Sequence, residues 1–439
     1  MSPEINPFLQ SSTSLEQATV TPQKNSRFFS PLVVEGGSLG IYGERGVGKS
    51  LMLNYIANPP RDWKEAYLQN HISIFFNCQD TIIPLSISNF WLQTIKQLDR
   101  KLEPSPIKDK CRALLTRIDE GNELNHNDFH EVLDVAAGAA KRIVLVLDDF
   151  DCLIRTSPEH FDNTRTFLQG FRSLTTRDSN RANLVVATRY SLQELCKPLT
   201  TPNYSAFENG FTNYRLRSFS ESELLKFLQR VEQTNQPPFT PAETRYIAYL
   251  SGYHPRLIQI AAAELFDQRF DIQLPLSDPS SIGERFKSEA RPILEGLWQG
   301  TSEIEKLLLM LITLQKLEGK VTGARYELRD LPDFLETKDR EINELTERGL
   351  LIRTQDNPPT WDLFSPIFQW WILKEIESSD PEQLNDRRKV WGELVTQKRA
   401  DQMGELVKWV KQNPESLKQL WDFVMQMATT GGFPKLPGT

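Results

Sequence analysis

Residues 43–50, which read Gly-Glu-Arg-Gly-Val-Gly-Lys-Ser, constrain the fold of this 439-residue chain more than any other stretch. They match the pattern G-x-x-x-x-G-K-S/T, in which backbone N–H groups turn inward around phosphates and glycines avoid the obstruction of a Cβ. A short apolar run precedes the loop at residues 39–42, and an amphipathic pattern follows it over residues 50–56. Because a helix N-terminus attracts anions, this order predicts a phosphate-binding loop in an α/β domain.

The pattern assigns a role to each position of the loop. We expect Lys49 to reach the β- and γ-phosphates of a nucleotide and the Ser50 hydroxyl to ligate Mg²⁺. A glycine-rich turn that matches by chance is the alternative, and the flanking strand and helix argue against it. The remaining nucleotide-contacting positions are expected to be Gly43, Arg45, Gly46, Val47, Gly48 and Leu51.

A second motif, Ile-Val-Leu-Val-Leu-Asp-Asp at residues 143–149, supplies two carboxylates. Its five apolar residues predict a fully buried strand of a parallel sheet, whose C-terminal end brings the two carboxylates to the nucleotide cleft. We expect Asp148 to hold Mg²⁺ through the water shell of the ion, and Asp149 to orient or deprotonate an attacking water. A strand followed by an acidic turn is the alternative. Its pairing with the loop about a hundred residues upstream favours a catalytic site.

A third apolar run, residues 184–188, ends in Thr188 and is followed by Arg189. If this strand lies between the other two, Thr188 and Arg189 face the γ-phosphate. Arg189 would then form a charge-assisted bond that disappears on hydrolysis. A solvated arginine at a strand end is the alternative. Arg181, in the turn before this strand, is a weaker candidate for an arginine finger that acts on a neighbouring subunit.

Charge and cysteine usage limit the partners and the compartment. The net charge is -7 and the isoelectric point about 5.5, so nothing global favours nucleic acid or an anionic membrane. The four cysteines are widely separated, which indicates free thiols in an intracellular protein. The start of the chain has no signal pattern, and the longest apolar stretch, residues 307–314, is far shorter than a membrane span. We expect a cytoplasmic protein without membrane contact.

The pattern along the chain predicts an α/β class with five domains or segments. Strands alternate with helical patterns from about 37 to 217, which is typical of a parallel sheet with helices on both faces. The expected strands are 39–42, 72–77, 143–147, 184–188 and 214–216. The expected segments are an N-terminal arm (1–36), a P-loop NTPase core (37–217), a helical lid (218–298), a winged helix (299–378) and a C-terminal helical tail (379–439).

Local sequence signals support the predicted helical lid and the predicted winged helix. Ser220 and Thr240-Pro241 are helix starts, and residues 252–255, Gly-Tyr-His-Pro, predict a tight corner between two helices. The winged helix is predicted from helices at 304–314, 328–335 and 339–347, followed by two wing strands at 349–353 and 360–364.

With these motifs in order, the chain resembles the STAND branch of AAA+-related signalling NTPases, the NB-ARC and NACHT class. The resemblance covers residues 6–377. It is carried by the loop at 43–50, Asp148 and Asp149, the sensor-like strand end at 187–189, the core-to-lid junction at 216–221, the lid motif at 252–255, and residues 347–351. Residues 6–8, Asn-Pro-Phe, are similar to the opening of bacterial members. The family's Gly-Arg element before the loop is replaced here by Ser26-Arg27-Phe28.

The resemblance implies a nucleotide-dependent switch. ATP or ADP, with Mg²⁺, is clamped between core and lid, with His254 and Pro255 contacting the nucleotide from the lid side. ADP stabilises a closed resting form, and exchange for ATP permits opening and assembly with protein partners or into a homo-oligomer. Low turnover is expected of such a switch.

Two other functions remain open. A DNA-associated AAA+ ATPase, such as a replication initiator or transposition regulator, also joins an NTPase core to a winged helix. The third helix of the predicted winged helix argues against DNA, because Lys338, Arg340 and Arg348 are offset by Asp339, Glu341, Glu344 and Glu347. The other alternative is a partner-binding module whose nucleotide only stabilises the fold.

Tryptophans in the C-terminal tail give a further expectation. Either the tail helices pack on the winged helix and complete its core, or they form a docking surface for an effector or second subunit. The residues concerned are Trp409, Trp421, Val424 and Met425.

Overall fold

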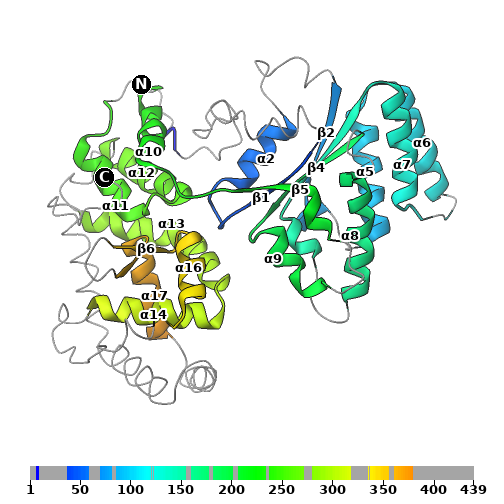
Figure 1. Ribbon diagram of the computed structural model, residues 1–439. Coiled ribbons are helices and arrows are strands. Elements are labelled where there is room, and N and C mark those ends of the chain that lie inside the picture. The colour runs from blue at the N-terminus through cyan, green and yellow to red at the C-terminus, as the bar shows by residue number, and fades with distance from the viewer. Residues whose placement is uncertain are drawn as a thin grey trace. The chain divides into compact units, whose positions relative to one another are not determined.

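The computed structural model (Figure 1) describes residues 6–8, 37–58, 70–81, 86–119, 121, 123–154, 160–176, 181–200, 206–233, 237–270, 279–317, 335, 337–354 and 360–378. The chain divides into two compact units. The core unit contains Ser12–Glu44 and Gly48–Leu216, and the helical unit contains Met1–Ser11, Arg45–Val47 and Arg217–Thr439. The expectations for the C-terminal tail, and for residues 328–334 of the second winged-helix helix, lie outside the described residues.

The core unit is built on a five-stranded parallel sheet, as the sequence predicts. Its order is β2-β3-β4-β1-β5, so β4 lies between β3 and β1. All seven residues of β4 are buried, and so are six of the seven in β3, which fits their apolar sequences. The strands are β1 (Ser38–Tyr42), β2 (His71–Asn77), β3 (Arg142–Asp148), β4 (Ala182–Thr188) and β5 (Phe211–Arg215).

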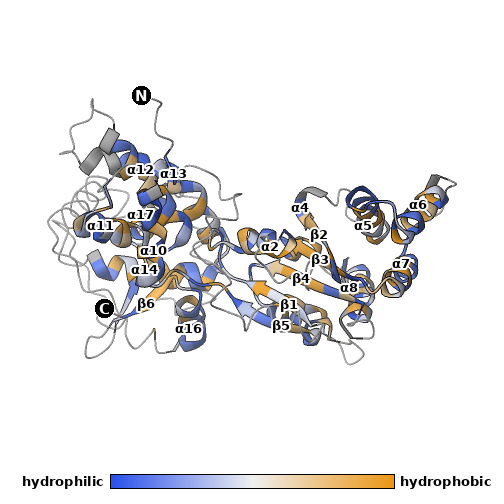
Figure 2. Ribbon diagram, turned by 90° about the horizontal axis from the view of Figure 1, so that it is seen from above, coloured by the Kyte–Doolittle hydropathy of each residue, from blue (hydrophilic) through white to orange (hydrophobic). Residues whose placement is uncertain are grey.

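Helices cover this sheet, and its central strands β3 and β4 consist mostly of hydrophobic residues (Figure 2). Alternate strand residues such as Leu145 and Val186 share one buried cluster with Phe90, Trp91 and Phe171 from the helices. Helix α2 (Lys49–Ala57) packs against β2, β3 and β4. The other helices are α4 (Cys78–Thr81), α5 (Ile87–Lys101), α6 (Pro106–Asp119), α7 (His126–Gly138), α8 (Phe161–Thr176) and α9 (Leu192–Cys196), with 3-10 turns η3 (Phe150–Leu153), η5 (Lys197–Leu199) and η6 (Phe207–Gly210).

One strand differs from its prediction. The sequence predicts residues 214–216, whereas β5 begins at Phe211 and ends at Arg215. The strand lies at the edge of the sheet, with Thr212 and Asn213 exposed, so half of it carries no apolar signal. The Leu216 N–H still donates to the Tyr42 carbonyl at 2.8 Å, which continues the pairing by one residue.

Helices of the helical unit begin at the residues that the sequence predicts. Ser220 and Thr240 each form a capping box with a glutamate three residues on, and Pro241 is the first residue of its helix. The helices are α10 (Glu221–Leu228), η7 (Gln229–Gln233), α11 (Pro241–Ser251), α12 (Pro255–Phe270), α13 (Pro279–Gln299), α14 (Glu303–Leu317), α16 (Asp339–Glu347) and α17 (Pro366–Ser378).

The corner between α11 and α12 is made by Gly252, which ends α11 in the left-handed conformation with φ 55°. A Cβ at this position would overlap the carbonyl group of Phe364. Next to it, the Ser365 hydroxyl donates to the Leu250 carbonyl at 2.6 Å. The corner and the segment before α17 are therefore packed backbone against backbone.

Several predicted parts of the winged helix are present in the helical unit. Helix α16 has the predicted bounds, and α14 contains the predicted first helix. Strands β6 (Leu351–Arg353) and β7 (Trp361–Leu363) form an antiparallel pair at the predicted wing positions. Of the predicted second helix only Leu335 is described, so the winged helix as a whole stays a prediction.

The segment Asn6, Pro7 and Phe8 is fixed to α12. The Asn6 side-chain amide donates to the Ala263 carbonyl at 3.0 Å, and the Gln259 amide donates to the Phe8 carbonyl at 2.9 Å. Phe8 is buried within the helical unit and its ring contacts three others, those of Phe227, Phe239 and Phe266.

All four cysteines are free thiols, as expected from their spacing. In the part of the chain that the structure describes, every helix is too short or too polar to span a bilayer.

Candidate nucleotide site

The glycines of the 43–50 loop are required by its backbone. Gly46 and Gly48 have φ angles of 83° and 103°, which residues with a Cβ rarely adopt. At Gly48 an added Cβ would meet no atom within 4 Å, so the backbone angle alone requires glycine. At Gly46 it would lie 2.8 Å from Cε1 of His254. The loop leads directly into α2, and Gly48 is the residue that precedes its first turn.

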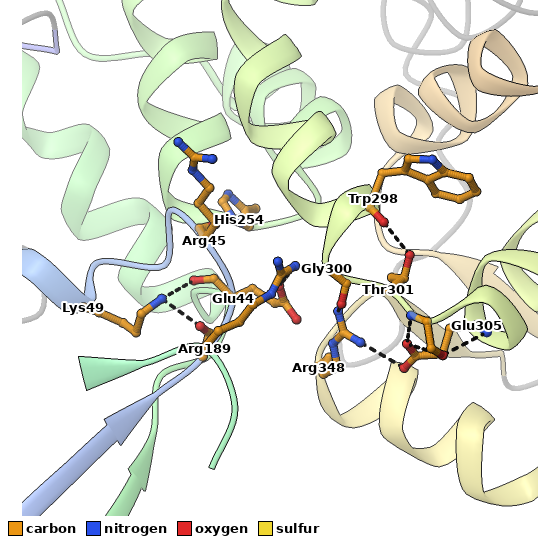
Figure 3. A network of polar contacts seen from close by, with 12 residues as sticks. Glu44, Arg45, Lys49, Arg189, His254, Trp298, Gly300, Thr301, Glu305 and Arg348 are labelled. Carbon is orange, nitrogen blue, oxygen red and sulfur yellow. Dashed lines mark hydrogen bonds and ion pairs between the residues drawn. The ribbon is translucent and has the colours of Figure 1, made fainter. Parts of the chain in front are cut away.

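Lys49 lies within this loop. Its Nζ donates to the carbonyl oxygens of Gly43 at 2.8 Å and Glu44 at 3.1 Å (Figure 3). Burial lowers the pKa of Lys49, and nearby carboxylates raise it against that effect, Glu44 most strongly and then Asp151, Asp148 and Asp149. The ammonium group therefore lies near four carboxylates, all within the core unit.

Ser50 and Asp148 meet directly. The Ser50 hydroxyl bonds to the Asp148 carboxylate, although 98 positions separate them in the sequence. Burial raises the pKa of Asp148, and this hydrogen bond partly lowers it again. Asp148 is the last residue of β3, and its Cα pairs with that of Asn77 at the end of β2. A hydroxyl that donates a hydrogen bond to a carboxylate places two oxygen ligands side by side, a set that can hold Mg²⁺ beside phosphates.

Within the described part of the chain, no other metal-ligand set competes with this pair. The described residues contain no group of three or more histidines, cysteines, aspartates and glutamates that could hold an ion. A Mg²⁺ ion takes most of its ligands from water and phosphate and needs only one or two side chains. The pair Ser50 and Asp148 therefore fits a magnesium–nucleotide site better than a metal site built from protein ligands alone.

Asp149 has an unusual backbone. Its φ is 50°, a left-handed conformation that few non-glycine residues adopt. Its N–H donates to Oδ1 of Asp148 at 3.1 Å, and the residue precedes the 3-10 turn η3. The two carboxylates are thus held by different means, Asp148 by the end of the strand and Asp149 by a strained turn.

Asp151 also belongs to this site, although no sequence motif points to it. It is half-buried in η3, and its carboxylate accepts the backbone N–H of Arg189. Burial raises the pKa of Asp151, while Lys49 and the Arg189 N–H lower it. The only sequence signal was a third aspartate two positions after Asp149, a spacing that also occurs in any acidic turn.

The end of β4 contributes Thr188 and Arg189. The Thr188 hydroxyl donates to the Tyr190 carbonyl at 2.6 Å, and its own carbonyl accepts the Gly43 N–H at 3.3 Å. Arg189 does not extend alone from the strand: its Nη2 lies 3.0 Å from Oε2 of Glu44 (Figure 3). The sensor-like strand end is therefore bound to the phosphate loop by both backbone and side chain.

His254 and Pro255 belong to the helical unit, together with the loop tip Arg45–Val47. Nε2 of His254 lies 2.9 Å from the Arg45 carbonyl oxygen, and the histidine is buried. Pro255 is the first residue of α12, and the Ile258 N–H donates to the His254 carbonyl. The expected lid motif thus contacts the backbone of the loop tip.

The remaining predicted residues have plainer surroundings. Val47 is buried, Leu51 is half-buried in α2, and Arg45 is exposed with its side chain beside Gly296. Arg181 forms an exposed ion pair with Asp134 at 2.6 Å, next to α7 of its own chain. The structure gives that arginine a partner within the core unit.

Comparison with known proteins bears on the class of domain. Residues 30–186 match the family model described as the AAA ATPase domain. No curated protein matches the sequence. The chain therefore carries a P-loop NTPase domain of AAA+ type, a domain class that binds nucleotides. The family match ends just before the residues of the sensor-like strand end, Thr188 and Arg189.

Three of the solved structures to which the chain is similar come from archaea. The Walker-type ATPase of Pyrococcus abyssi is 15% identical, with 83% of this chain and 99% of that chain covered and a TM-score of 0.53. The Aeropyrum pernix ORC2 protein is 15% identical, with coverages of 81% and 94% and a TM-score of 0.49. The Aeropyrum pernix ORC1 protein in complex with DNA is 13% identical, with coverages of 84% and 95% and a TM-score of 0.41. The Pyrococcus abyssi likeness supports the fold alone.

Proposed function

We propose that this protein is a magnesium-dependent ATPase of low turnover whose bound nucleotide acts as a molecular switch for assembly with protein partners. The observation that carries the proposal is the meeting of Ser50 with Asp148 beside Lys49. These three side chains come from two distant motifs, and together they supply what a triphosphate and its ion require.

Four side chains of the core unit have defined tasks in this proposal. Lys49 binds the β- and γ-phosphates, exchanging its present carbonyl acceptors for phosphate oxygens. Ser50 and Asp148 would hold Mg²⁺, which supplies charge neutralisation at the phosphates when bound. Asp149 accepts a proton from, or orients, the attacking water at its carboxylate oxygens.

The switch is expected to involve the loop tip. His254 bonds to the Arg45 carbonyl, and Gly46 leaves no room for a Cβ beside the imidazole. A change in the loop when a nucleotide binds would therefore alter the position of the first turn of α12. ATP rather than GTP is proposed from the resemblance to STAND proteins, because no described side chain identifies the purine.

Protein partners are proposed in preference to DNA because of the charge on α16. Its charged residues are four acids and one arginine, Asp339, Glu341, Glu344, Glu347 and Arg340. Arg348, which follows, cannot reach a DNA groove because its side chain is 6% exposed and paired with Glu305 (Figure 3). A helix that enters the major groove needs a net positive face.

Steady-state ATP turnover tests the catalytic part of this proposal. We expect Lys49→Ala and Asp149→Asn to lower turnover by about a hundredfold or more, since each removes an interaction with the phosphates or the water. The Asp149→Asn protein should still bind ATP, whereas Lys49→Ala should bind it weakly. Rates equal to those of the parent in both variants would rule out the assigned roles.

The switch has a separate test. The nucleotide that co-purifies with the protein is identified, then exchanged, and the molecular mass is measured by light scattering. Bound ADP that gives way to ATP with growth of the assembly supports a switch. An unchanged mass after complete exchange would contradict nucleotide-controlled assembly and leave only the ATPase.

A further inference from the structure

Glu44 occupies a variable position of the loop motif, yet its side chain is 5% exposed. Such a buried carboxylate needs a partner, because an unpaired charge in a low-dielectric setting is costly. The partner is Arg189, whose Nη2 lies 3.0 Å from Oε2 of Glu44 (Figure 3). Both residues belong to the core unit. The loop therefore holds the sensor-like arginine with one of its own side chains.

Glu44 also acts on the other cation of the site. Among the carboxylates that raise the pKa of Lys49 against burial, that of Glu44 has the largest effect. The Glu44 carbonyl additionally accepts a hydrogen bond from Lys49. One carboxylate is thus paired with Arg189 and also raises the pKa of Lys49, and these are the two cations expected to contact the terminal phosphate. In the sign of its charge, though not in its magnitude, the carboxylate resembles a phosphate group placed near these two cations.

The backbone around Arg189 is fixed, so the guanidinium is the part that can change partner. The Arg189 N–H is bound by the Asp151 carboxylate, and the preceding carbonyl, that of Thr188, accepts the Gly43 N–H. The Arg189 side chain is 21% exposed, which leaves it access to solvent and to a ligand. A long side chain on a fixed Cα can exchange one oxyanion for another by rotation alone.

We propose that Glu44 determines nucleotide specificity by competing with the terminal phosphate of ATP for Arg189. The inference rests on the nucleotide site proposed above. ADP has no γ-phosphate and leaves the pair of Glu44 with Arg189 intact. ATP must take over the guanidinium and leave Glu44 close to a new negative charge, which costs binding energy. Glu44 therefore favours ADP, and its removal favours ATP.

The test compares two dissociation constants in each protein. Mg²⁺ with ADP, and Mg²⁺ with a non-hydrolysable ATP analogue, are titrated into the full chain by calorimetry. In Glu44→Gln, which keeps the size of the side chain and removes its charge, we expect the analogue to bind about five- to tenfold tighter relative to ADP. The ADP affinity itself should change less than about twofold.

Two further variants make the result specific. Asp134→Asn breaks the exposed ion pair with Arg181 in the same unit, and it should leave the ratio of the two affinities unchanged. In an Arg189→Met background, Glu44→Gln should no longer change the ratio, because the competition needs the arginine. Thermal unfolding of each variant, without added nucleotide, identifies any loss of folding.

Each other outcome overturns the inference. If both nucleotides bind and the ratio is the same in Glu44→Gln as in the parent, Glu44 has no part in specificity, and the proposed ATPase stands. Equal tightening for both nucleotides would show a general charge effect and not competition for Arg189. If the parent binds neither nucleotide, the proposed function fails together with the inference.

Discussion

At the scale of single residues, the motifs predicted which side chains carry the chemistry but not which of them touch. The sequence predicts that Arg189 lies at a strand end and faces phosphate, and its motifs give no role to Glu44. The structure joins the two by an ion pair. A motif fixes residue types along the chain, whereas a contact across the site depends on the sheet order and on rotamers. Asp151 was missed for the same reason, because its partner is a backbone N–H from another strand.

Asp148→Asn tests the electrostatic cost of the site. Burial raises the pKa of Asp148, so the folded protein binds this proton more tightly than the unfolded chain. The ionised carboxylate therefore destabilises the fold at neutral pH, and this cost decreases as the pH falls towards the raised pKa. We expect the asparagine variant, measured with a chelator present, to melt at a higher temperature than the parent.

The same variant should lose the stabilisation that Mg²⁺ and ATP give the parent. Differential scanning calorimetry with and without the ligands measures both effects. A lower melting temperature in the chelator would show that the carboxylate stabilises the apoprotein, contrary to this account.

At the scale of elements, apolar runs and capping signals were sufficient for most of the fold. Strands β1 to β4 and helix α16 follow the predicted positions closely, because each is a buried run or is bounded by strong start and stop residues. Edge strand β5 was shifted, since its exposed Thr212 and Asn213 carry no apolar signal. The sheet order was not predictable, as it depends on crossovers and not on local patterns.

The corner of α11 and α12 is expected to be intolerant of a side chain. Gly252→Ala would force a left-handed alanine and an overlap with the Phe364 carbonyl, so we expect a loss of about 3 kcal/mol or more in unfolding free energy. Gly138→Ala is the control, because this glycine ends α7 with nothing within 4 Å of an added Cβ. It should be neutral or stabilising by up to about 1 kcal/mol. Urea unfolding of the full chain measures both, and equal effects would contradict the steric argument.

The buried ion pair between Arg348 and Glu305 connects α16 to α14. The side chains are each 6% exposed, and Arg348 also donates to the Gly300 carbonyl at 3.0 Å. Arg348→Met leaves the Glu305 carboxylate buried without its cation, and we expect a loss of about 3–5 kcal/mol in the free energy of unfolding.

Chemical denaturation compares this variant with Asp134→Asn, whose exposed pair with Arg181 should contribute less than about 1 kcal/mol. Adding Glu305→Gln to Arg348→Met should recover part of the loss. Similarly small losses of unfolding free energy in Arg348→Met and Asp134→Asn would show that a buried ion pair is no more costly to break than an exposed one.

At the scale of the whole molecule, the net charge does not favour binding of nucleic acid. The chain has 58 acidic and 51 basic residues, and the acids dominate α16. We expect no measurable binding of duplex DNA even at low salt, where phosphate contacts are strongest. Fluorescence anisotropy with a labelled duplex over a salt titration measures this. Micromolar or tighter affinity that falls steeply with salt would favour the DNA-associated alternative.

The loop glycines, Lys49, Ser50 and Asp148 are proposed to bind one magnesium–triphosphate complex. The most direct measurement is the affinity for ATP by calorimetry, with Mg²⁺ and with a chelator, in the parent and in Asp148→Asn. We expect Mg²⁺ to tighten ATP binding by about tenfold or more in the parent, the effect of roughly one charge-assisted contact, and to change it little in the variant. Equal dependence on Mg²⁺ in the two proteins, or no binding of ATP by the parent, would contradict it.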